Sequence, residues 1–169
     1  FDATGRELEA RLAPGPDGIG IAIDDAGAIY PLTVDPVLNG PAWTAESDQA
    51  DARFGNSVAT AGDVNGDGYS DVIVGAPYYD NGQTDEGQAF LYLGSGAGLS
   101  TSAVWTAESN QNRAYFGYCV ATAGDVNGDG YSDVIVGAIL YDNQNADEGG
   151  AFVYLGTGAG LATSAAWTA

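Results

Sequence analysis

The sequence predicts an all-β protein: two propeller-type blades of four antiparallel strands each, preceded by a further β segment, in an incomplete propeller or open repeat array. Three observations support this fold class. The chain repeats itself every 62 residues, as the spacing of Trp43, Trp105 and Trp167 shows. Short β-branched and aromatic runs alternate with loops of Gly, Asp, Asn and Ser. No stretch of the sequence keeps the apolar period of a helix.

The repeat runs from Trp43 to Val104 and again from Trp105 to Ala166, with 46 of 62 positions identical. The run VATAGDVNGDGYSDVIVGA occurs unchanged in both copies. Such a period indicates supersecondary units that stack to bury a shared core. We therefore expect residues 43–104 to form the first repeat, and residues 105–169 the second repeat with the start of a further unit.

Each repeat is expected to contain a four-stranded antiparallel meander. In the first copy, the apolar run 54–61 predicts the first strand. The β-branched run 71–76 has the length of a strand buried on both faces. The aromatic run 87–94 predicts the third strand, and residues 102–107 a weaker fourth one.

Residues 1–42 lie outside the repeat. Residues 7–13 and 18–34 alternate like strands, with turns at 14–18 and 24–27, and a linker follows. This pattern indicates either the end of a preceding β-domain or strands that pair with another chain. Because the sequence starts at Phe1, we expect it to be part of a longer protein.

The charge is strongly acidic, with 23 Asp and Glu against four Arg, no Lys and no His. A net charge of −19 argues against binding nucleic acid or an anionic membrane and suits a cation-binding protein. Without His, Ser-His-Asp and Cys-His catalysis are excluded within this chain. The single cysteine, Cys119, replaces Ser57 of the first copy, and we expect it to be a small buried filler. No apolar run is long enough to span a membrane.

The repeated stretch DVNGDGYSD predicts a calcium loop. Side-chain oxygens occur at positions 1, 3, 5 and 9, a glycine that permits positive φ occurs at position 6, and position 7 adds its carbonyl. Hard oxygen donors without sulfur or imidazole favour Ca²⁺. The loop is not an EF-hand, because Val74 and Val136 occupy position 12 and a β-branched run follows. The alternative is a pair of turns that bind nothing, but two identical copies in so acidic a chain favour metal.

These residues resemble a known family. Phe54-Gly55, the acidic loop and Gly75-Ala76-Pro77 form the signature of the FG-GAP repeats found in integrin α-subunit propellers and bacterial extracellular proteins. The resemblance implies four-stranded blades with Ca²⁺ held between the first and second strands. It implies these ligands: Asp63, Asn65, Asp67, Asp71 and the Tyr69 carbonyl; and Asp125, Asn127, Asp129, Asp133 and the Tyr131 carbonyl.

The chain departs from the family at two points. Ile139 replaces the proline of the second copy, and two blades cannot close a ring that usually has seven. Residues 26–36 are similar to a segment that precedes such repeats in bacterial surface proteins.

Other side chains could carry chemistry. Asp85-Glu86 and Asp147-Glu148 could act as general acid and base, but adjacent residues on a strand point apart, and a turn or a second cation contact is the preferred interpretation. The repeated Trp residues could stack on sugars, although a core position between blades is more typical. Tyr78, Tyr79 and Tyr141 are candidates for contact with a partner or for ordinary loop packing.

The sequence thus predicts a non-enzymatic, calcium-binding, extracellular or cell-surface module of bacterial type with a structural or adhesive role. Unpaired strand edges and an uncovered face require further repeats or further copies, and end-to-end contacts would form a filament. In such an assembly, residues 1–42 or the terminal Trp167–Ala169 would complete a neighbour's sheet. The alternatives are a carbohydrate- or ligand-binding propeller and an accessory domain of an extracellular hydrolase.

Overall fold

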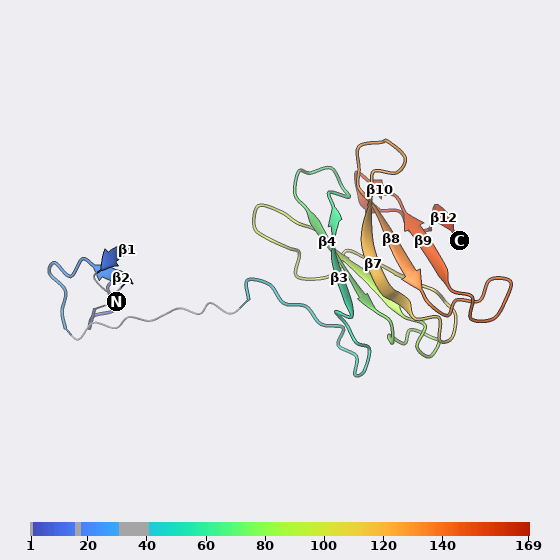
Figure 1. The fold of residues 1–169 in the computed structure, drawn as a ribbon, viewed down its shortest axis with the longest axis horizontal. Helices are drawn as coiled ribbons and strands as arrows, with labels where there is room; N and C mark the ends of the chain where they lie inside the picture. Colours follow the sequence, from blue (N-terminus) through green and yellow to red (C-terminus); the bar gives the residue numbers. More distant parts are fainter. Residues whose placement is uncertain (1, 16–17, 31–40) are drawn as a thin grey trace. The chain divides into compact units, whose positions relative to one another are not determined.

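A computed structural model describes residues 2–15, 18–30 and 41–169, which form two compact units, Phe1–Ala42 and Trp43–Ala169 (Figure 1). All regular structure in the described ranges is β, in antiparallel sheets. The predicted fold class is therefore confirmed. The described residues contain no helix suited to crossing a membrane.

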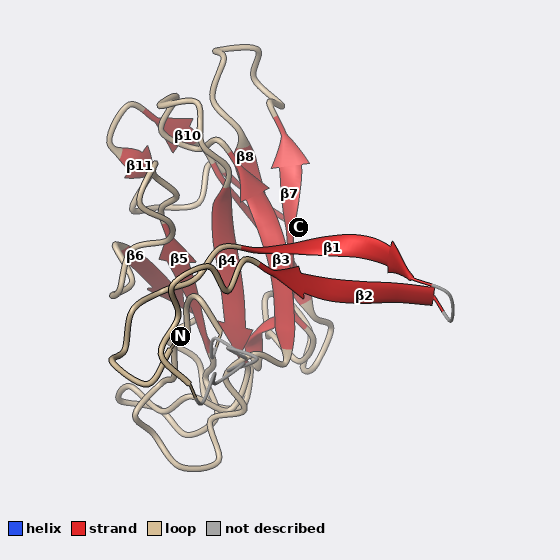
Figure 2. Ribbon diagram, turned by 90° about the vertical axis from the view of Figure 1, so that its left-hand side faces the viewer, coloured by secondary structure: helices blue, strands red, loops and turns tan. Residues whose placement is uncertain are grey.

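The N-terminal unit contains a hairpin of β1 (Ala10–Gly15) and β2 (Gly18–Ile23), seen in Figure 2. The second strand ends at Ile23, earlier than the expected 18–34, because residues 24–28 turn. Asp24 Oδ1 accepts the N–H of Ala26 at 3.0 Å, and the N–H of Ala28 donates to the carbonyl of Asp25 at 2.9 Å. The rest of the expected strand, from residue 31, lies outside the described residues.

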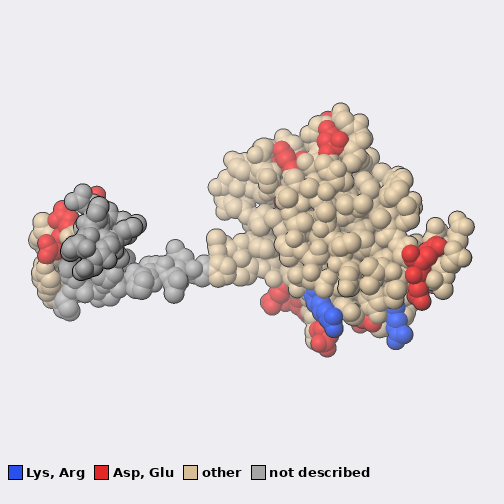
Figure 3. Space-filling view, viewed as in Figure 1, with Lys and Arg blue, Asp and Glu red and all other residues tan. Residues whose placement is uncertain are grey.

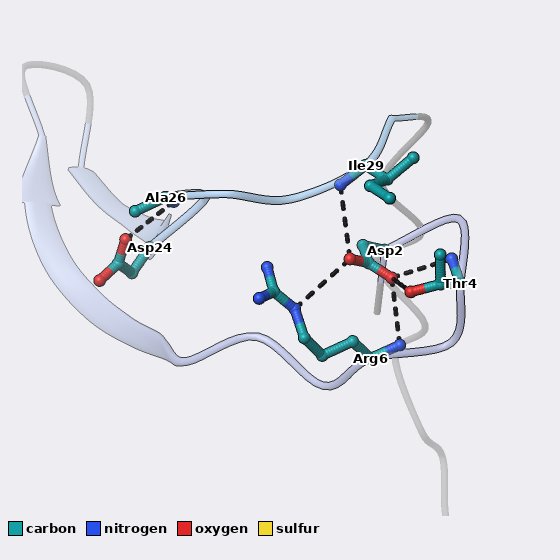
Figure 4. Close-up of polar contacts among 6 residues, drawn as sticks. All are labelled: Asp2, Thr4, Arg6, Asp24, Ala26 and Ile29. Atoms are coloured by element: carbon teal, nitrogen blue, oxygen red, sulfur yellow. Dashed lines mark hydrogen bonds and ion pairs between the residues drawn. The ribbon is translucent and has the colours of Figure 1, made fainter.

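Asp2 joins the first turn of the N-terminal unit to Ile29 (Figure 4). Its buried carboxylate accepts the hydroxyl of Thr4 at 2.6 Å and the N–H groups of Thr4, Arg6 and Ile29 at 2.9, 3.1 and 3.4 Å. Nε of Arg6 adds an ion pair at 3.4 Å. The Thr4 hydroxyl, followed by the backbone donors, holds the pKa of Asp2 well below its usual range.

The first sheet of the repeat unit is a meander in chain order. Its strands are β3 (Ser57–Gly62), β4 (Asp71–Ala76), β5 (Gln88–Tyr92) and β6 (Trp105–Glu108). The second strand has the predicted bounds, and the others lie within one to three residues of them. Since β6 begins at Trp105, the first sheet takes its fourth strand from the start of the second sequence repeat.

The second sheet repeats this order with β7 (Phe116–Gly124), β8 (Asp133–Ala138), β9 (Gly150–Tyr154) and β12 (Trp167–Thr168). A small hairpin of β10 (Gly156–Thr157) and β11 (Gly160–Leu161) precedes β12. Trp167 pairs with Val153 of the same chain. The expectation that the terminal WTA completes a neighbour's sheet is therefore wrong in this structure. β12 pairs with β9 of the same chain, just as β6 pairs with β5.

The two sheets pack face to face around one hydrophobic cluster. Ile73 and Leu91 project from the first sheet, and Val120, Val134 and Phe152 from the second. The opposite face of the first sheet carries Val74, Phe90 and Tyr92, packed against Trp43 and Phe54. Alternation along β4 therefore buries both of its faces, as a β-branched strand predicts.

Candidate metal centre

The predicted metal loops join β3 to β4 and β7 to β8, at the same end of both sheets (Figure 1). In the first loop, Asp63 accepts the N–H groups of Gly66, Asp67 and Gly68 at 2.7, 3.1 and 2.9 Å. Asp125 accepts the equivalent three donors at 2.7, 3.0 and 2.9 Å. One carboxylate thus fixes the curvature of each loop.

The loop also brings its other oxygen side chains together. The N–H of Asp67 lies 3.2 Å from Asn65 Oδ1, and Asn65 Nδ2 lies 3.0 Å from Asp67 Oδ2. Asp67 Oδ1 accepts the N–H of Tyr69 at 2.9 Å. The glycine at position 6 has the expected positive φ, 88° at Gly68 and 94° in the second loop. Three of the predicted ligands, Asp63, Asn65 and Asp67, therefore share one hydrogen-bonded turn.

Asp71 has an additional role that the sequence pattern did not reveal. Its side chain is completely buried, and its two oxygens accept the N–H groups of Val64 and Gly94, each at 2.8 Å. Burial raises the pKa of Asp71, whereas these two donors oppose the shift. Asp71 thereby joins the start of the metal loop to the residues that follow β5. The only signal for this role in the sequence is the glycine that recurs at 94 and 156.

Asp133 does the same in the second repeat, accepting the N–H groups of Val126 and Gly156 at 2.8 Å. Across the described ranges, no three carboxylate or thiol side chains surround one point so as to hold a metal between them. Each carboxylate oxygen of Asp71 and Asp133 accepts one backbone N–H and keeps a second lone pair that could bind a cation. The structure thus groups the first three side-chain ligands and places the position 9 carboxylate beside the loop's first turn.

The donor set of both loops consists of oxygen alone, which fits a hard cation such as Ca²⁺. The repeat unit has only two basic residues, Arg53 and Arg113, and in the described ranges neither forms an ion pair. On the face drawn in Figure 3, the basic side chains of this unit lie at its lower end, whereas acidic ones lie at both ends. Among the described residues, no basic side chain therefore neutralises the loop carboxylates.

The two identical loops lie in different environments. The N–H of Ser132 donates to the carbonyl of Asp63 at 2.9 Å, and the Ser132 hydroxyl accepts the N–H of Asp63 at 3.2 Å. Val64 is completely buried, whereas its equivalent Val126 is 57% exposed. The second repeat thus covers the first loop, whereas within the repeat unit Trp43–Ala169 no other repeat covers the second loop.

The tryptophans and tyrosines serve mainly in packing. Trp105 is buried against Tyr154 at a ring distance of 4.9 Å and donates Nε1–H to the carbonyl of Ala162. Trp43 makes the equivalent contacts in the first repeat. The rings of Tyr79 and Tyr141 lie 5.6 and 5.1 Å from Phe90 and Phe152.

The ring centroid of Tyr78 lies 4.9 Å from that of Tyr115 in the second repeat. The Arg53 guanidinium lies over the Tyr78 ring, 4.2 Å from its centroid. The favoured interpretation of the Trp residues, a core position, holds for Trp105. Trp167 is 52% exposed, so the core position expected of the repeated tryptophans is wrong for this residue.

The paired acids lie in the loops that connect β4 to β5 and β8 to β9. Asp85 and Asp147 adopt left-handed φ values of 52° and 55°, and their N–H groups donate to Asp80 and Asp142. Each pair therefore stabilises a turn, as the preferred interpretation expects. Glu86 is completely buried, whereas Glu148 is exposed.

Cys119 corrects one prediction. It was expected to be buried, but it is exposed. The reason is its position: Ser57, at the same place in the first repeat, accepts the N–H of Val120 at 3.1 Å across the sheet interface. Cys119 lies on the outward-facing side of the second sheet, against which no further sheet packs within residues 43–169.

Comparison with known proteins agrees with the repeat pattern. The family model for the FG-GAP repeat matches residues 54–92 and 116–154. Integrin alpha pat-2 of Caenorhabditis briggsae is 39% identical over 111 residues, covering 63% of this chain and 9% of that protein. Integrin alpha-IIb of Mus musculus is 37% identical over 119 residues, covering 68% and 11%.

Integrin alpha-5 of Xenopus laevis is 30% identical over 125 residues, covering 71% of this chain and 12% of that protein. The chain thus spans about a tenth of the length of these relatives. Each matched segment contains the first three strands of one four-stranded sheet and the acidic loop between the first two of them. Through these two repeats, the chain belongs to the FG-GAP repeat family.

Proposed function

We propose that this chain is a non-enzymatic, calcium-binding module of an extracellular protein, with a structural or adhesive role. The observation that carries the proposal is the pair of oxygen-rich loops, identical in sequence and held in the same conformation by the same three backbone donors. The related integrin α-subunits support an adhesion-type role.

We assign the first site to Asp63, Asn65, Asp67, the carbonyl of Tyr69, and Asp71. The second uses Asp125, Asn127, Asp129, the carbonyl of Tyr131, and Asp133. At millimolar calcium and a Kd of about 0.01–0.1 mM, occupancy would stabilise each repeat by roughly 1.4–2.7 kcal/mol. In a chain of net charge −19, the ion would also relieve repulsion between neighbouring carboxylates.

Calcium titration of chelator-treated protein by calorimetry tests the assignment. Asp63→Asn and Asp125→Asn should each remove one binding event, and together they should remove both loop events. Asp24→Asn is the matched control, because Asp24 is an exposed acid in the N-terminal unit. Unchanged stoichiometry in the double variant would contradict the proposal.

The same module is suited to continue into further repeats. The outer face of the second sheet exposes side chains whose equivalents are buried between the sheets: Val126 and Trp167 are 57% and 52% exposed, whereas Val64 and Trp105 are 0% and 9% exposed. Conversely, Val58 is 61% exposed and Val120 is 7% exposed. The chain therefore presents, at its two outer faces, the two halves of its own internal interface.

We infer that another FG-GAP repeat covers each outer face, supplied by a longer chain or by a second copy. Sedimentation of this chain with calcium over a concentration series should show association, which Val126→Asp abolishes and Tyr118→Ser leaves largely intact. A concentration-independent monomer would contradict association between copies.

A ligand-binding role has one observation in its favour. Two grooves of about 250 and 430 Å³ occupy equivalent positions in the two repeats. Each is lined by a Tyr, two Thr and a Glu: Tyr154, Thr106, Thr163 and Glu108 in one, and Tyr92, Thr44, Thr101 and Glu46 in the other. A glycan array separates the candidates, because a purely structural module gives no signal.

A further inference from the structure

The loop between β4 and β5, residues 77–87, is held from the outside by the second repeat. The N–H of Phe116 and the hydroxyl of Ser109 both donate to the carbonyl of Glu86 at 2.9 Å. The N–H of Arg113 donates to the carbonyl of Thr84 at 2.8 Å. A Cβ on Gly87 would lie 2.1 Å from the carbonyl oxygen of Phe116, so the two repeats meet here without space between their backbones.

This closure buries Glu86 completely, with its carboxylate turned into its own loop. Oε1 accepts the N–H of Asn81 at 2.6 Å and the N–H of Gln83 at 3.4 Å. Oε2 is buried and has no hydrogen-bond partner among the described residues, and neither has the buried Oε1 of Gln83. Both of these oxygens are acceptors, so the species that satisfies them donates hydrogen bonds or is a cation.

The surrounding charge favours a cation. Asp80 accepts the N–H of Asp85 at 2.6 Å, and Glu108 accepts the side-chain amide of Asn81 at 2.6 Å, so two further acids and Asp85 itself belong to the same loop region. In the described part of the chain, no basic side chain forms an ion pair with any of them. A buried, unpaired carboxylate is costly unless a partner neutralises it.

We propose that Glu86 and Gln83 form a third cation site, distinct from the two acidic loops, in which Oε2 of Glu86 and Oε1 of Gln83 bind a hard divalent cation such as Ca²⁺. A water molecule could donate to Oε2 of Glu86, but it would leave the carboxylate charge uncompensated. The packing of the second repeat closes the site, since it is this repeat that excludes solvent from Glu86.

The second repeat contains a natural control. Asn145 and Glu148 occupy the positions of Gln83 and Glu86. There Asn145 Nδ2 donates to Glu148 Oε2 at 2.9 Å, and Glu148 is exposed. No acceptor of Glu148 is buried and unsatisfied, so the equivalent site is not expected to bind a cation in this chain.

Equilibrium dialysis of the full chain against Ca²⁺, with metal content measured in each variant, tests the proposal. We expect three bound ions in the unaltered chain and in Glu148→Gln, two in Glu86→Gln, and one in the double variant Asp63→Asn/Asp125→Asn. Equal stoichiometry in Glu86→Gln and the unaltered chain would overturn the third site and leave the two loop sites standing. Loss of no ion in the double loop variant would instead contradict the loop sites.

Gln83→Leu gives a second, independent measurement, because Gln83 is only partly buried and its loss should not prevent folding. This variant should bind the third ion at least tenfold more weakly, while retaining the other two. An unchanged affinity for all three ions would overturn the assignment of Gln83 as a ligand.

Discussion

Gly75 of the first repeat lies directly against Gly117 of the second. A Cβ on Gly75 would be 1.9 Å from the carbonyl oxygen of Gly117, and a Cβ on Gly117 would be 3.2 Å from the Cα of Gly75. These residues are the glycine of the GAP segment in one repeat and the glycine of the FG segment in the next. The two halves of the signature therefore meet across a sheet interface, where only hydrogen atoms fit.

Replacing Gly75 by Ala should destabilise the chain by about 2–3 kcal/mol, because the added methyl group meets backbone that cannot move without separating the sheets. Gly137→Ala is the matched control: its Cβ would lie 2.4 Å from the sulfur of Cys119, whereas the carbonyl oxygen of Cys119 lies at an ordinary contact distance of 3.9 Å. That side chain is exposed and can rotate away, so a cost below about 1 kcal/mol is expected. Urea denaturation measures both variants, and equal costs would contradict the interface described above.

Val64→Ala and Val126→Ala test the asymmetry between the repeats. Val64 is completely buried, and its truncation should cost about 2 kcal/mol in free energy of unfolding. Val126 is 57% exposed, and its truncation should change the stability of the dilute monomer by less than about 0.5 kcal/mol. A large effect at Val126 in dilute protein would mean that this face is covered within the monomer.

Asp71→Asn separates the structural role of this residue from metal binding. The amide presents an NH₂ group where the carboxylate accepts two buried backbone donors, so a loss of about 1–3 kcal/mol is expected even with chelator present. Asp67→Asn, in the exposed part of the loop, should lower calcium affinity and leave the chelator-treated protein nearly unchanged. Thermal melts of both variants, with calcium and with chelator, provide the measurement. Equal chelator-treated melting temperatures would refute the structural role.

Alkaline stability should report on Tyr154. Burial raises its pKa to about 12 in the folded chain, from the ordinary value near 10. Between these values the folded state holds a proton that the unfolded state has lost. The contribution to stability is therefore fully present below about pH 10 and is lost as the pH rises to about 12.

Unfolding free energies measured from pH 9 to 12 should fall more steeply in the unaltered chain than in Tyr154→Phe, which has no phenol to titrate at this position. Absorbance titration of the folded chain at 295 nm should show the missing late-titrating group in the variant. Parallel pH profiles for the two proteins would contradict the raised pKa.

The strands, the repeat and the glycine turns could be predicted from the sequence because each depends on a local pattern. The run from Asp71 to Ala76 formed a strand with the predicted bounds, and Gly68 adopted the predicted positive φ. The grouping of Asp63, Asn65 and Asp67 also follows from their spacing within one turn. Hydrophobic alternation and backbone preference act over a few residues, and they are the same in both copies.

The tertiary structure decided which faces of each copy are buried. Val64 and Val126 lie in identical sequence stretches, yet Val64 is buried and Val126 is exposed. Likewise, Glu86 is buried, whereas Glu148, at the same position of the second acid pair, is exposed. Cys119 is exposed, whereas Ser57 at the same place in the first repeat contacts the second sheet, because burial depends on which sheet lies alongside. A repeat specifies its own strands and turns, whereas the burial of its faces is set by contact with the next repeat.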